Sequence, residues 1–86
     1  MPLVVIEFYG LARLRAGRAE LQLEAATIGT ALAAADAACP GLRALGDNGL
    51  SPEYRLSVGG KFFTDKLAEP LHEGDALLIL GADAGG

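Results

Sequence analysis

Two apolar segments, one near each end of the chain, constrain the fold more than any other feature of the sequence. In residues 3–9 both alternating faces carry apolar side chains, with Val4, Ile6 and Phe8 on one face. Residues 76–80 are an unbroken apolar run of strand length, in which Leu77 and Ile79 are expected to face inward. Strands that are apolar on both faces are typical of the covered centre of a sheet with parallel pairing, so we predict that these two strands lie parallel there. The positions expected to face outward are Leu3, Val5, Glu7 and Tyr9 in the first strand and Leu78 and Leu80 in the last.

Three further strands are predicted between these two segments. Residues 19–24 alternate apolar and polar side chains and should form a hairpin with the first strand, across an exposed connection over the arginine-rich residues 11–18. Residues 54–58 alternate in the same way and predict a third strand. Gly59 and Gly60 provide the positive φ angles of a tight hairpin, so residues 61–64 should return as a short fourth strand. Residues 65–75 are predicted to be a loop, because they contain several turn-forming residues.

One helix is predicted in the middle of the chain. The hydroxyl of Thr27 can accept a hydrogen bond from a free N–H group in the first helical turn, which marks a helix start. Pro40 and Gly41 end the helix. After it, Leu42 and Leu45 should pack under the domain, and residues 46–52 read as a surface loop. The side chains that recur on one side of the helix, at spacings of three to four, are Ile28, Leu32, Ala35 and Cys39.

The predicted order of elements is strand, strand, helix, strand, strand, strand, and the one helix should cover one face of the sheet. A chain of 86 residues has room for one domain, and a hydrophobic content of 51% is enough for a packed core. This order is typical of a β-grasp, an α+β fold in which a mixed sheet of four to five strands packs on one main helix. We expect the domain to span residues 1–80 and residues 81–86 to form a flexible C-terminal tail.

The formal net charge of −4 restricts the classes of partner. It argues against a nucleic-acid ligand, because the phosphate backbone attracts positive surfaces, and it favours a basic partner. The single cysteine, Cys39, can form neither an internal disulfide nor a multi-thiolate metal site. No stretch approaches the roughly 18 consecutive apolar residues of a membrane span, and the N-terminus has no signal-type segment. We therefore expect a cytoplasmic protein with no membrane partner and no metal site.

No combination of side chains indicates a self-contained active site. His72 lies in a turn-rich segment with no nucleophile in view and is interpreted as a solvated loop residue. Cys39 falls on the inward stripe of the helix, where a buried, unreactive thiol is expected. We therefore predict that the chain is not an enzyme by itself. The acidic residues interpreted as parts of a solvated surface include Glu69, Glu73, Asp75 and Asp83.

The last six residues are the feature that suggests chemistry. They read Gly-Ala-Asp-Ala-Gly-Gly, follow an apolar strand directly and end on the carboxylate of Gly86. Two residues without Cβ atoms are thin enough to enter a narrow channel, so this carboxylate could react inside a partner's active site. A carboxylate becomes an acyl donor only after activation, which a partner could supply by joining it to a nucleotide phosphate. Small-residue tails are also common without any function, and a terminal Gly-Gly can be left by precursor processing.

Several short motifs occur along the chain in a fixed order. They are Phe8-Tyr9-Gly10, then Arg13 and Gly17, Val58-Gly59-Gly60-Lys61-Phe62, Leu71-His72-Glu73-Gly74-Asp75 and Gly85-Gly86. With these motifs nearly the whole chain resembles the MoaD/ThiS family of ubiquitin-like sulfur carriers, and in particular the small subunit of molybdopterin synthase. The chain departs from the family in one respect, since the family often has prolines before the terminal glycines, where this chain has Gly81, Ala82 and Asp83. The tail is therefore expected to be looser than is usual in the family.

The resemblance implies acyl chemistry at Gly86, with Gly85 beside it. An E1-like adenylyltransferase would use ATP to adenylate the Gly86 carboxylate, and a sulfurtransferase or other sulfur donor would convert the acyl-adenylate to a thiocarboxylate. This thiocarboxylate would enter the large subunit of molybdopterin synthase and sulfurate a pterin precursor, while the carrier itself binds no cofactor tightly. The same chemistry also fits a sulfur carrier for thiamine, cysteine or tRNA thiolation, or a ubiquitin-like modifier conjugated to lysine.

The resemblance also implies a docking surface on the exposed face of the sheet, at Tyr9, Phe62 and Leu80. The alternation of apolar side chains independently places Tyr9 and Leu80 outward, where they would form an apolar patch of the kind that marks an interface. Phe62 and Phe63 cannot be distinguished by pattern, so Phe62 rests on the resemblance. Scattered exposed apolar residues are the alternative interpretation of this patch. The tail residues expected to contact partner proteins are Gly81, Ala82, Asp83 and Ala84.

Overall fold

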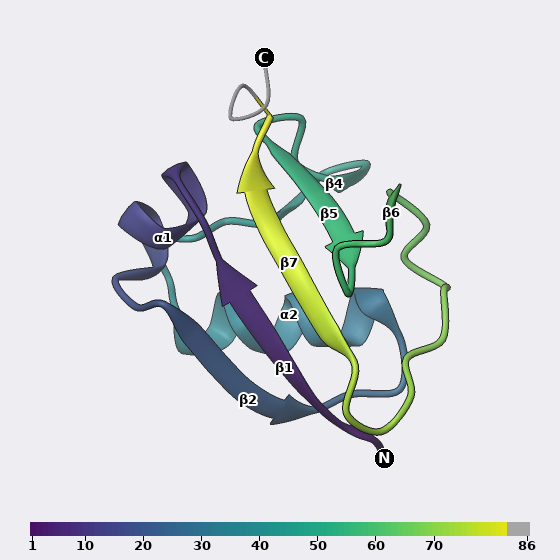
Figure 1. Ribbon diagram of the computed structural model, residues 1–86. Coiled ribbons are helices and arrows are strands. Elements are labelled where there is room, and N and C mark those ends of the chain that lie inside the picture. Colours follow the sequence, from purple (N-terminus) through teal and green to yellow (C-terminus); the bar gives the residue numbers. More distant parts are fainter. Residues whose placement is uncertain (83–86) are drawn as a thin grey trace.

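Five strands form one mixed sheet in the order β2-β1-β7-β5-β6 (Figure 1). The computed structural model describes residues 1–82. β1 and β7 run parallel as neighbours, and the other pairings in this sheet are antiparallel. The predicted α+β β-grasp and its parallel inner strands are thereby confirmed, with β7 in the middle of the sheet. The strand bounds are Leu3–Phe8 for β1, Glu20–Glu24 for β2, Tyr54–Val58 for β5, Phe62–Thr64 for β6 and Ala76–Gly81 for β7.

The helix α2, Ile28–Ala38, crosses one face of the sheet (Figure 1). Thr27 caps it as predicted, because its Oγ1 accepts a hydrogen bond from the backbone amide of Thr30 at 3.2 Å. Thr30 Oγ1 in turn accepts a hydrogen bond from the backbone amide of Thr27 at 3.1 Å, which closes a capping box. The predicted inward stripe of α2 is confirmed, since all four of its members are buried: Ile28, Leu32, Ala35 and Cys39.

The core lies between α2 and the inner face of the sheet. Its largest fully buried side chains include those that the alternation in β1 and β7 placed inward: Val4, Ile6, Phe8, Leu77 and Ile79. Leu42 is also fully buried, as predicted, while Leu45 is half-buried against the core. The apolar periods of two and of three to four residues therefore identified the core-facing side chains of the sheet and of the helix.

Residues 11–18 connect β1 to β2 and several of them are exposed, as predicted, but the short helix that they contain, α1, Leu11–Ala16, was not predicted. Glycines bound it at both ends. Gly10 has a φ of 56°, and Gly17 has a φ of 74° and donates its amide to the carbonyl of Arg13 at 3.0 Å. Leu, Ala and Arg are strong helix formers, and Ala12 anchors the helix because its side chain is fully buried. The arginines suggested a solvated loop, but six residues are too few to show a helical period.

The predicted surface loop at residues 46–52 contains a small hairpin. Its strands are β3, Leu45–Gly46, and β4, Gly49–Leu50, joined by a two-residue turn at Asp47 and Asn48. The carboxylate of Asp36 in α2 accepts hydrogen bonds from the backbone amides of Ala44 and Leu45 at 2.7 and 3.0 Å. This anchor attaches the hairpin to the helix. Two-residue strands leave too little alternation to be read from sequence.

The predicted loop at residues 65–75 is confirmed, and it is attached to the start of α2. The backbone amide of Gly29 donates to the carbonyl of Leu67 at 2.8 Å, and that of Leu71 donates to Ala26 at 2.8 Å. The predicted glycine hairpin before β6 is also confirmed, since Gly59 and Gly60 have φ angles of 63° and 73°. Neither helix in residues 1–82 has the length and apolar character that a membrane crossing requires.

Candidate functional site

The structure describes the predicted C-terminal tail only up to Ala82. Gly85 and Gly86, together with Asp83 and Ala84, lie outside the described residues. The expected boundary between domain and tail falls after residue 80, but β7 continues through Gly81. We call Gly81 and Ala82 the tail exit, and this segment with the adjoining sheet face forms the candidate site.

The sheet and α1 hold the tail exit from two sides. Within the sheet, Gly81 stands opposite Tyr54 in β5. The backbone amide of Ala82 donates a hydrogen bond of 2.7 Å to the carbonyl of Glu53. On the other side Gly81 approaches α1 so closely that an added Cβ atom would lie 3.3 Å from Cβ of Leu11. A glycine at this position therefore lets β7 pass beside α1.

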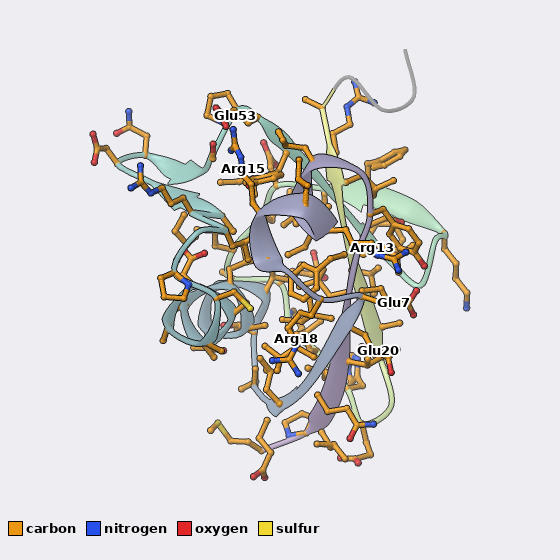
Figure 2. The ribbon with its side chains drawn as sticks, turned by 90° about the vertical axis from the view of Figure 1, so that its left-hand side faces the viewer. Glu7, Arg13, Arg15, Arg18, Glu20 and Glu53 are labelled. Carbon is orange, nitrogen blue, oxygen red and sulfur yellow. The ribbon has the colours of Figure 1, made fainter. Side chains whose placement is uncertain are left out.

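An ion pair connects α1 to the start of β5 beside the tail exit. Arg15 Nη1 donates a hydrogen bond to Glu53 Oε2, and the two side chains point toward each other (Figure 2). Arg15 also donates to the hydroxyl of Tyr54 at 3.3 Å, and this hydroxyl donates to the carbonyl of Leu42 in the core. The hydrogen bond from Arg15 lowers the pKa of Glu53 from its ordinary value, and the same bond raises the pKa of Arg15. Both partners are therefore charged at neutral pH.

The sheet face that α2 leaves uncovered, which we call the open face, carries the predicted docking residues Tyr9 and Leu80. Tyr9 follows β1 and is 41% exposed, and Leu80 is half-buried opposite Arg55. Their predicted outward orientation is confirmed by the burial of the alternate residues in β1 and β7. One row of cross-strand neighbours on this face runs from β2 to β6 through Glu20, Glu7, Leu78, Ser57 and Phe63.

The register of β6 separates the two adjacent phenylalanines. Phe63 stands opposite Ser57, whose other neighbour is Leu78, so Phe63 belongs to the open face. Phe62 stands opposite Val58 and therefore points to the side of the sheet that packs on α2, although it is 50% exposed at the edge. Phe63 is 63% exposed, and the guanidinium of Arg55 lies 5.5 Å from its ring centroid. A docking role for Phe62 stays a prediction, while the geometry adds Phe63 to the open face.

The margin of the open face next to β2 is acidic. The hydroxyl of Tyr9 donates a hydrogen bond to the carboxylate of Glu7, and Glu20 stands directly opposite Glu7. The hydrogen bond to Glu7 raises the pKa of Tyr9. Two carboxylates that face each other across strands repel, so a positive group of a partner would be favoured there. This margin agrees with the basic partner inferred from the net charge.

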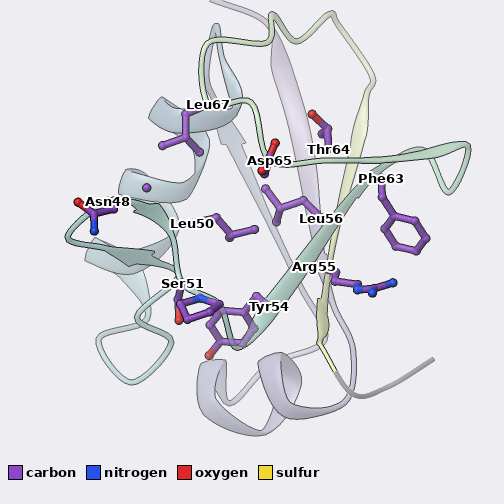
Figure 3. A pocket seen from close by; sticks show the side chains of 12 residues that line it. Asn48, Leu50, Ser51, Tyr54, Arg55, Leu56, Phe63, Thr64, Asp65 and Leu67 are labelled. Carbon is purple, nitrogen blue, oxygen red and sulfur yellow. The ribbon is translucent and has the colours of Figure 1, made fainter. Parts of the chain in front are cut away.

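A hollow of about 530 Å³ lies at the opposite edge of the sheet from β2, next to β5 and β6 (Figure 3). It lies between the β3–β4 hairpin and strands β5 and β6. The hollow could not be predicted from the sequence, because the β3–β4 hairpin beside it has strands too short to show an alternation. Its labelled lining side chains in Figure 3 include Leu50, Tyr54, Leu56, Phe63, Asp65 and Leu67.

The two residues that the sequence analysis set aside lie away from the tail exit. The backbone amide of His72 donates to the carboxylate of Asp75 at 2.8 Å, and its side chain is 79% exposed. Cys39 is buried at the C-terminus of α2. Both environments agree with the structural roles predicted for these residues.

Some residues of the candidate site were missed by sequence reasoning. Leu78 was placed outward together with Leu80 but was not included in the predicted docking surface, although the alternation in β7 supplied the signal. Arg15 and Glu53 are 38 positions apart, and nothing in their local sequence indicates that they pair.

Solved structures of known proteins share this fold. The crystal structure of small archaeal modifier protein 1 (SAMP1) from Haloferax volcanii has a TM-score of 0.82 and 26% sequence identity, over 98% of this chain and 99% of that chain. The solution structure of SAMP1 from Methanosarcina acetivorans has a TM-score of 0.83 and 21% identity, over 100% and 98% of the two chains. A putative molybdopterin converting factor subunit 1 from Pyrococcus furiosus has a TM-score of 0.76 and 16% identity, over 94% and 98%.

No protein-family model matches the chain, and no curated protein matches it by sequence. The likeness therefore comes from the solved structures and extends over almost the full length of both chains. It confirms the ubiquitin-like β-grasp fold of the MoaD/ThiS kind that the sequence motifs indicated.

Proposed function

We propose, from the ubiquitin-like β-grasp fold that this chain shares with small archaeal modifier proteins and a molybdopterin converting factor subunit, that it is a carrier acting through Gly86. In this proposal the folded body has no catalytic function of its own. It docks on partner enzymes and presents the C-terminal carboxylate to their active sites.

The observation that carries the proposal is the position of the tail exit next to the open face. β7 contributes Leu78 and Leu80 to that face and then continues into Gly81, which leads to the tail. A partner that covers the open face therefore lies directly beside the point where the tail begins. This arrangement supports a function in which docking and reaction occur on one partner.

The proposed chemistry begins with activation of the Gly86 carboxylate. A carboxylate oxygen attacks the α-phosphorus of ATP in an E1-like adenylyltransferase, which forms an acyl-adenylate and releases pyrophosphate. Hydrosulfide then attacks the acyl carbon, the bond to the adenylate oxygen breaks, and AMP and a proton leave. The product is a Gly86 thiocarboxylate. We propose that its main use is sulfur transfer to a pterin precursor in the large subunit of molybdopterin synthase, which the name of the Pyrococcus furiosus protein supports.

A second function is favoured by the two SAMP1 structures, which are called modifiers. In that case the ε-amine of a target lysine attacks the activated Gly86 acyl carbon, and an isopeptide forms as the leaving group departs. Activation by the E1-like enzyme is common to both functions, so they differ only in the nucleophile.

Intact-mass measurement tests the proposal. The purified chain is incubated with the E1-like adenylyltransferase of its source organism, ATP and hydrosulfide. A thiocarboxylate raises the mass by the difference between one sulfur and one oxygen atom, and omission of ATP removes the change. Species linked through lysine, found in the source cells and absent when Gly86 is deleted, would favour the modifier function. A chain that neither gains this mass nor forms conjugates contradicts the proposal.

A further inference from the structure

Three contacts form a closed triangle around the tail exit. Leu11 in α1 lies beside Gly81 in β7, where an added Cβ atom would lie 3.3 Å from the Cβ of Leu11. Arg15, one helical turn further along α1, forms the ion pair with Glu53 at the start of β5. The carbonyl of the same Glu53 accepts the hydrogen bond from the amide of Ala82. α1, β5 and β7 are therefore each joined to the other two at the point where the chain leaves the body.

Each side of this triangle limits a different motion. The side chain of Leu11 lies beside Gly81 and limits how far β7 can shift toward α1, because even one added Cβ atom at Gly81 would be crowded there. The hydrogen bond from Ala82 to Glu53 keeps the chain in the plane of the sheet. The ion pair holds α1 and Glu53 together. Arg15 is also held in place by a second hydrogen bond, which it donates to the hydroxyl of the buried Tyr54.

We propose that Arg15 and Glu53 are positioning residues for the reaction at Gly86, which aim the tail by fixing Ala82. This inference depends on the proposed function and specifies which residues of the body assist it. Neither residue belongs to the open face, so neither is needed for docking there.

The physical reason is the short distance between Ala82 and the reacting group. Gly86 is the fourth residue after Ala82, and four residues reach at most about 14 Å when fully extended. A change in the direction of the chain at Ala82 therefore displaces the carboxylate by a large fraction of that length. Since a reacting atom must be held close to its attack geometry, a loosened exit lowers the fraction of docked molecules that are ready to react.

The first experiment compares Arg15→Gln, Glu53→Gln and the double variant with the wild type. Adenylation of the chain by the E1-like enzyme is followed as pyrophosphate release, and kcat and KM are determined for each chain. Arg18→Gln is the matched control, because it removes the same charge from the same connection between β1 and β2, and within residues 1–82 Arg18 donates only to the carbonyl of Glu20.

For an exposed ion pair, kcat should fall by about two- to fivefold while KM stays unchanged. The double variant should lose no more than either single one, since both remove one interaction. Arg15→Lys should recover part of the loss, and Arg18→Gln should behave as the wild type. Hydrogen exchange of the Ala82 amide is measured on the same proteins, and it should accelerate by a similar factor only in the Arg15→Gln and Glu53→Gln chains.

A second experiment uses side-chain size. Gly81→Ala places a methyl group 3.3 Å from the Cβ of Leu11 and should lower kcat, and Leu11→Gly in the same chain should restore part of it, because glycine removes that Cβ atom. If Gly81 mattered only for entry into a narrow channel of the partner, Leu11→Gly would restore nothing.

The outcomes separate this inference from the proposed function. A wild-type chain that is not adenylated contradicts the proposed function, and the exchange of Ala82 then still shows whether the ion pair fixes the exit. Faster exchange with unchanged kcat would overturn the positioning role, and so would equal exchange in all variants. An increase in KM with unchanged kcat would assign Arg15 and Glu53 to docking instead and would also overturn it.

Discussion

The backbone amide of Ala82 donates a hydrogen bond to the carbonyl of Glu53 across 2.7 Å, so the sheet holds the chain beyond the last residue of β7. The expected boundary at residue 80 would have released the chain two residues earlier. Because of this bond, changes at the extreme C-terminus and changes in the folded body should have separable effects.

Deleting Gly86, or adding one residue after it, should abolish thiocarboxylate formation and leave thermal stability unchanged. The reason is that the packed core is complete within residues 4–79, as the buried side chains show. Intact mass after incubation with the E1-like enzyme measures the first effect, and the thermal unfolding midpoint measures the second. Sulfur transfer by the shortened chain would show that another group carries the chemistry.

Tyr9→Ala and Leu80→Ala should weaken binding to the E1-like enzyme, each by about 1–2 kcal/mol of binding free energy, because both lie on the open face. Titration calorimetry with the purified partner measures the affinity. Chemical denaturation of the same variants is the control, and its midpoint should change less than the affinity. A lower denaturation midpoint with unchanged affinity would mean that Tyr9 and Leu80 stabilise the fold and do not contact the partner.

Phe63→Ala and Phe62→Ala form a matched pair, because the two residues are neighbours with opposite orientations in β6. Phe63→Ala should reduce affinity for a partner that covers the open face, and Phe62→Ala should reduce it less, contrary to the role that the sequence resemblance implied for Phe62. The same calorimetric titration compares them. An equal loss of affinity in the two variants, or a larger loss in Phe62→Ala, would show that partners also contact the other side of β6 at the edge of the sheet.

Tyr54→Phe should destabilise the fold by about 1–3 kcal/mol, because it leaves the carbonyl of the buried Leu42 without its hydrogen-bond donor. Chemical denaturation gives the free energy of unfolding. Tyr9→Phe is the control, since it also removes a hydroxyl but at an exposed position. A similar loss for both variants would contradict the structural role of the Tyr54 hydroxyl.

The stability supplied by the Arg15–Glu53 pair should depend on pH. The pKa of Glu53 in the folded chain lies below its ordinary value of 4.5, so the unfolded chain takes up the proton first as the pH falls. The contribution is therefore fully present above pH 4.5 and is lost as the pH falls through the lowered pKa. Denaturation midpoints of the wild type and Glu53→Gln should accordingly differ by a small constant amount at neutral pH and converge in acid. A difference that persists in acid would contradict the charge-based origin.

The parts of the fold that sequence could predict are those in which one local pattern repeats several times. β1 carries apolar side chains over successive positions and is followed closely by Gly10, β7 is an unbroken apolar run of strand length, and α2 combines a cap at Thr27 with an inward stripe of four residues. In each case the length and composition of the segment indicate one element. These elements also fix the open face, so Tyr9 and Leu80 could be assigned to it without a structure.

The remaining parts depend on contacts between segments that are distant in sequence. α1 is too short to show a period and is fixed by glycines at its ends and by packing of Ala12. The side to which Phe62 and Phe63 point is set by the register of a three-residue strand against β5, which two adjacent identical residues do not reveal. The Arg15–Glu53 pair joins segments that only the finished fold brings together.

The middle position of β7 has a consequence for biosynthesis. A ribosome delivers residues 76–81 after every other strand of this sheet, so β1 and β5 lack their common neighbour until those residues have been made. A nascent chain interrupted before that point cannot pair the two halves of its sheet through β7. Only molecules that contain residues 76–81 can thus acquire the assembled sheet, which excludes shorter products from any enzyme that selects for it.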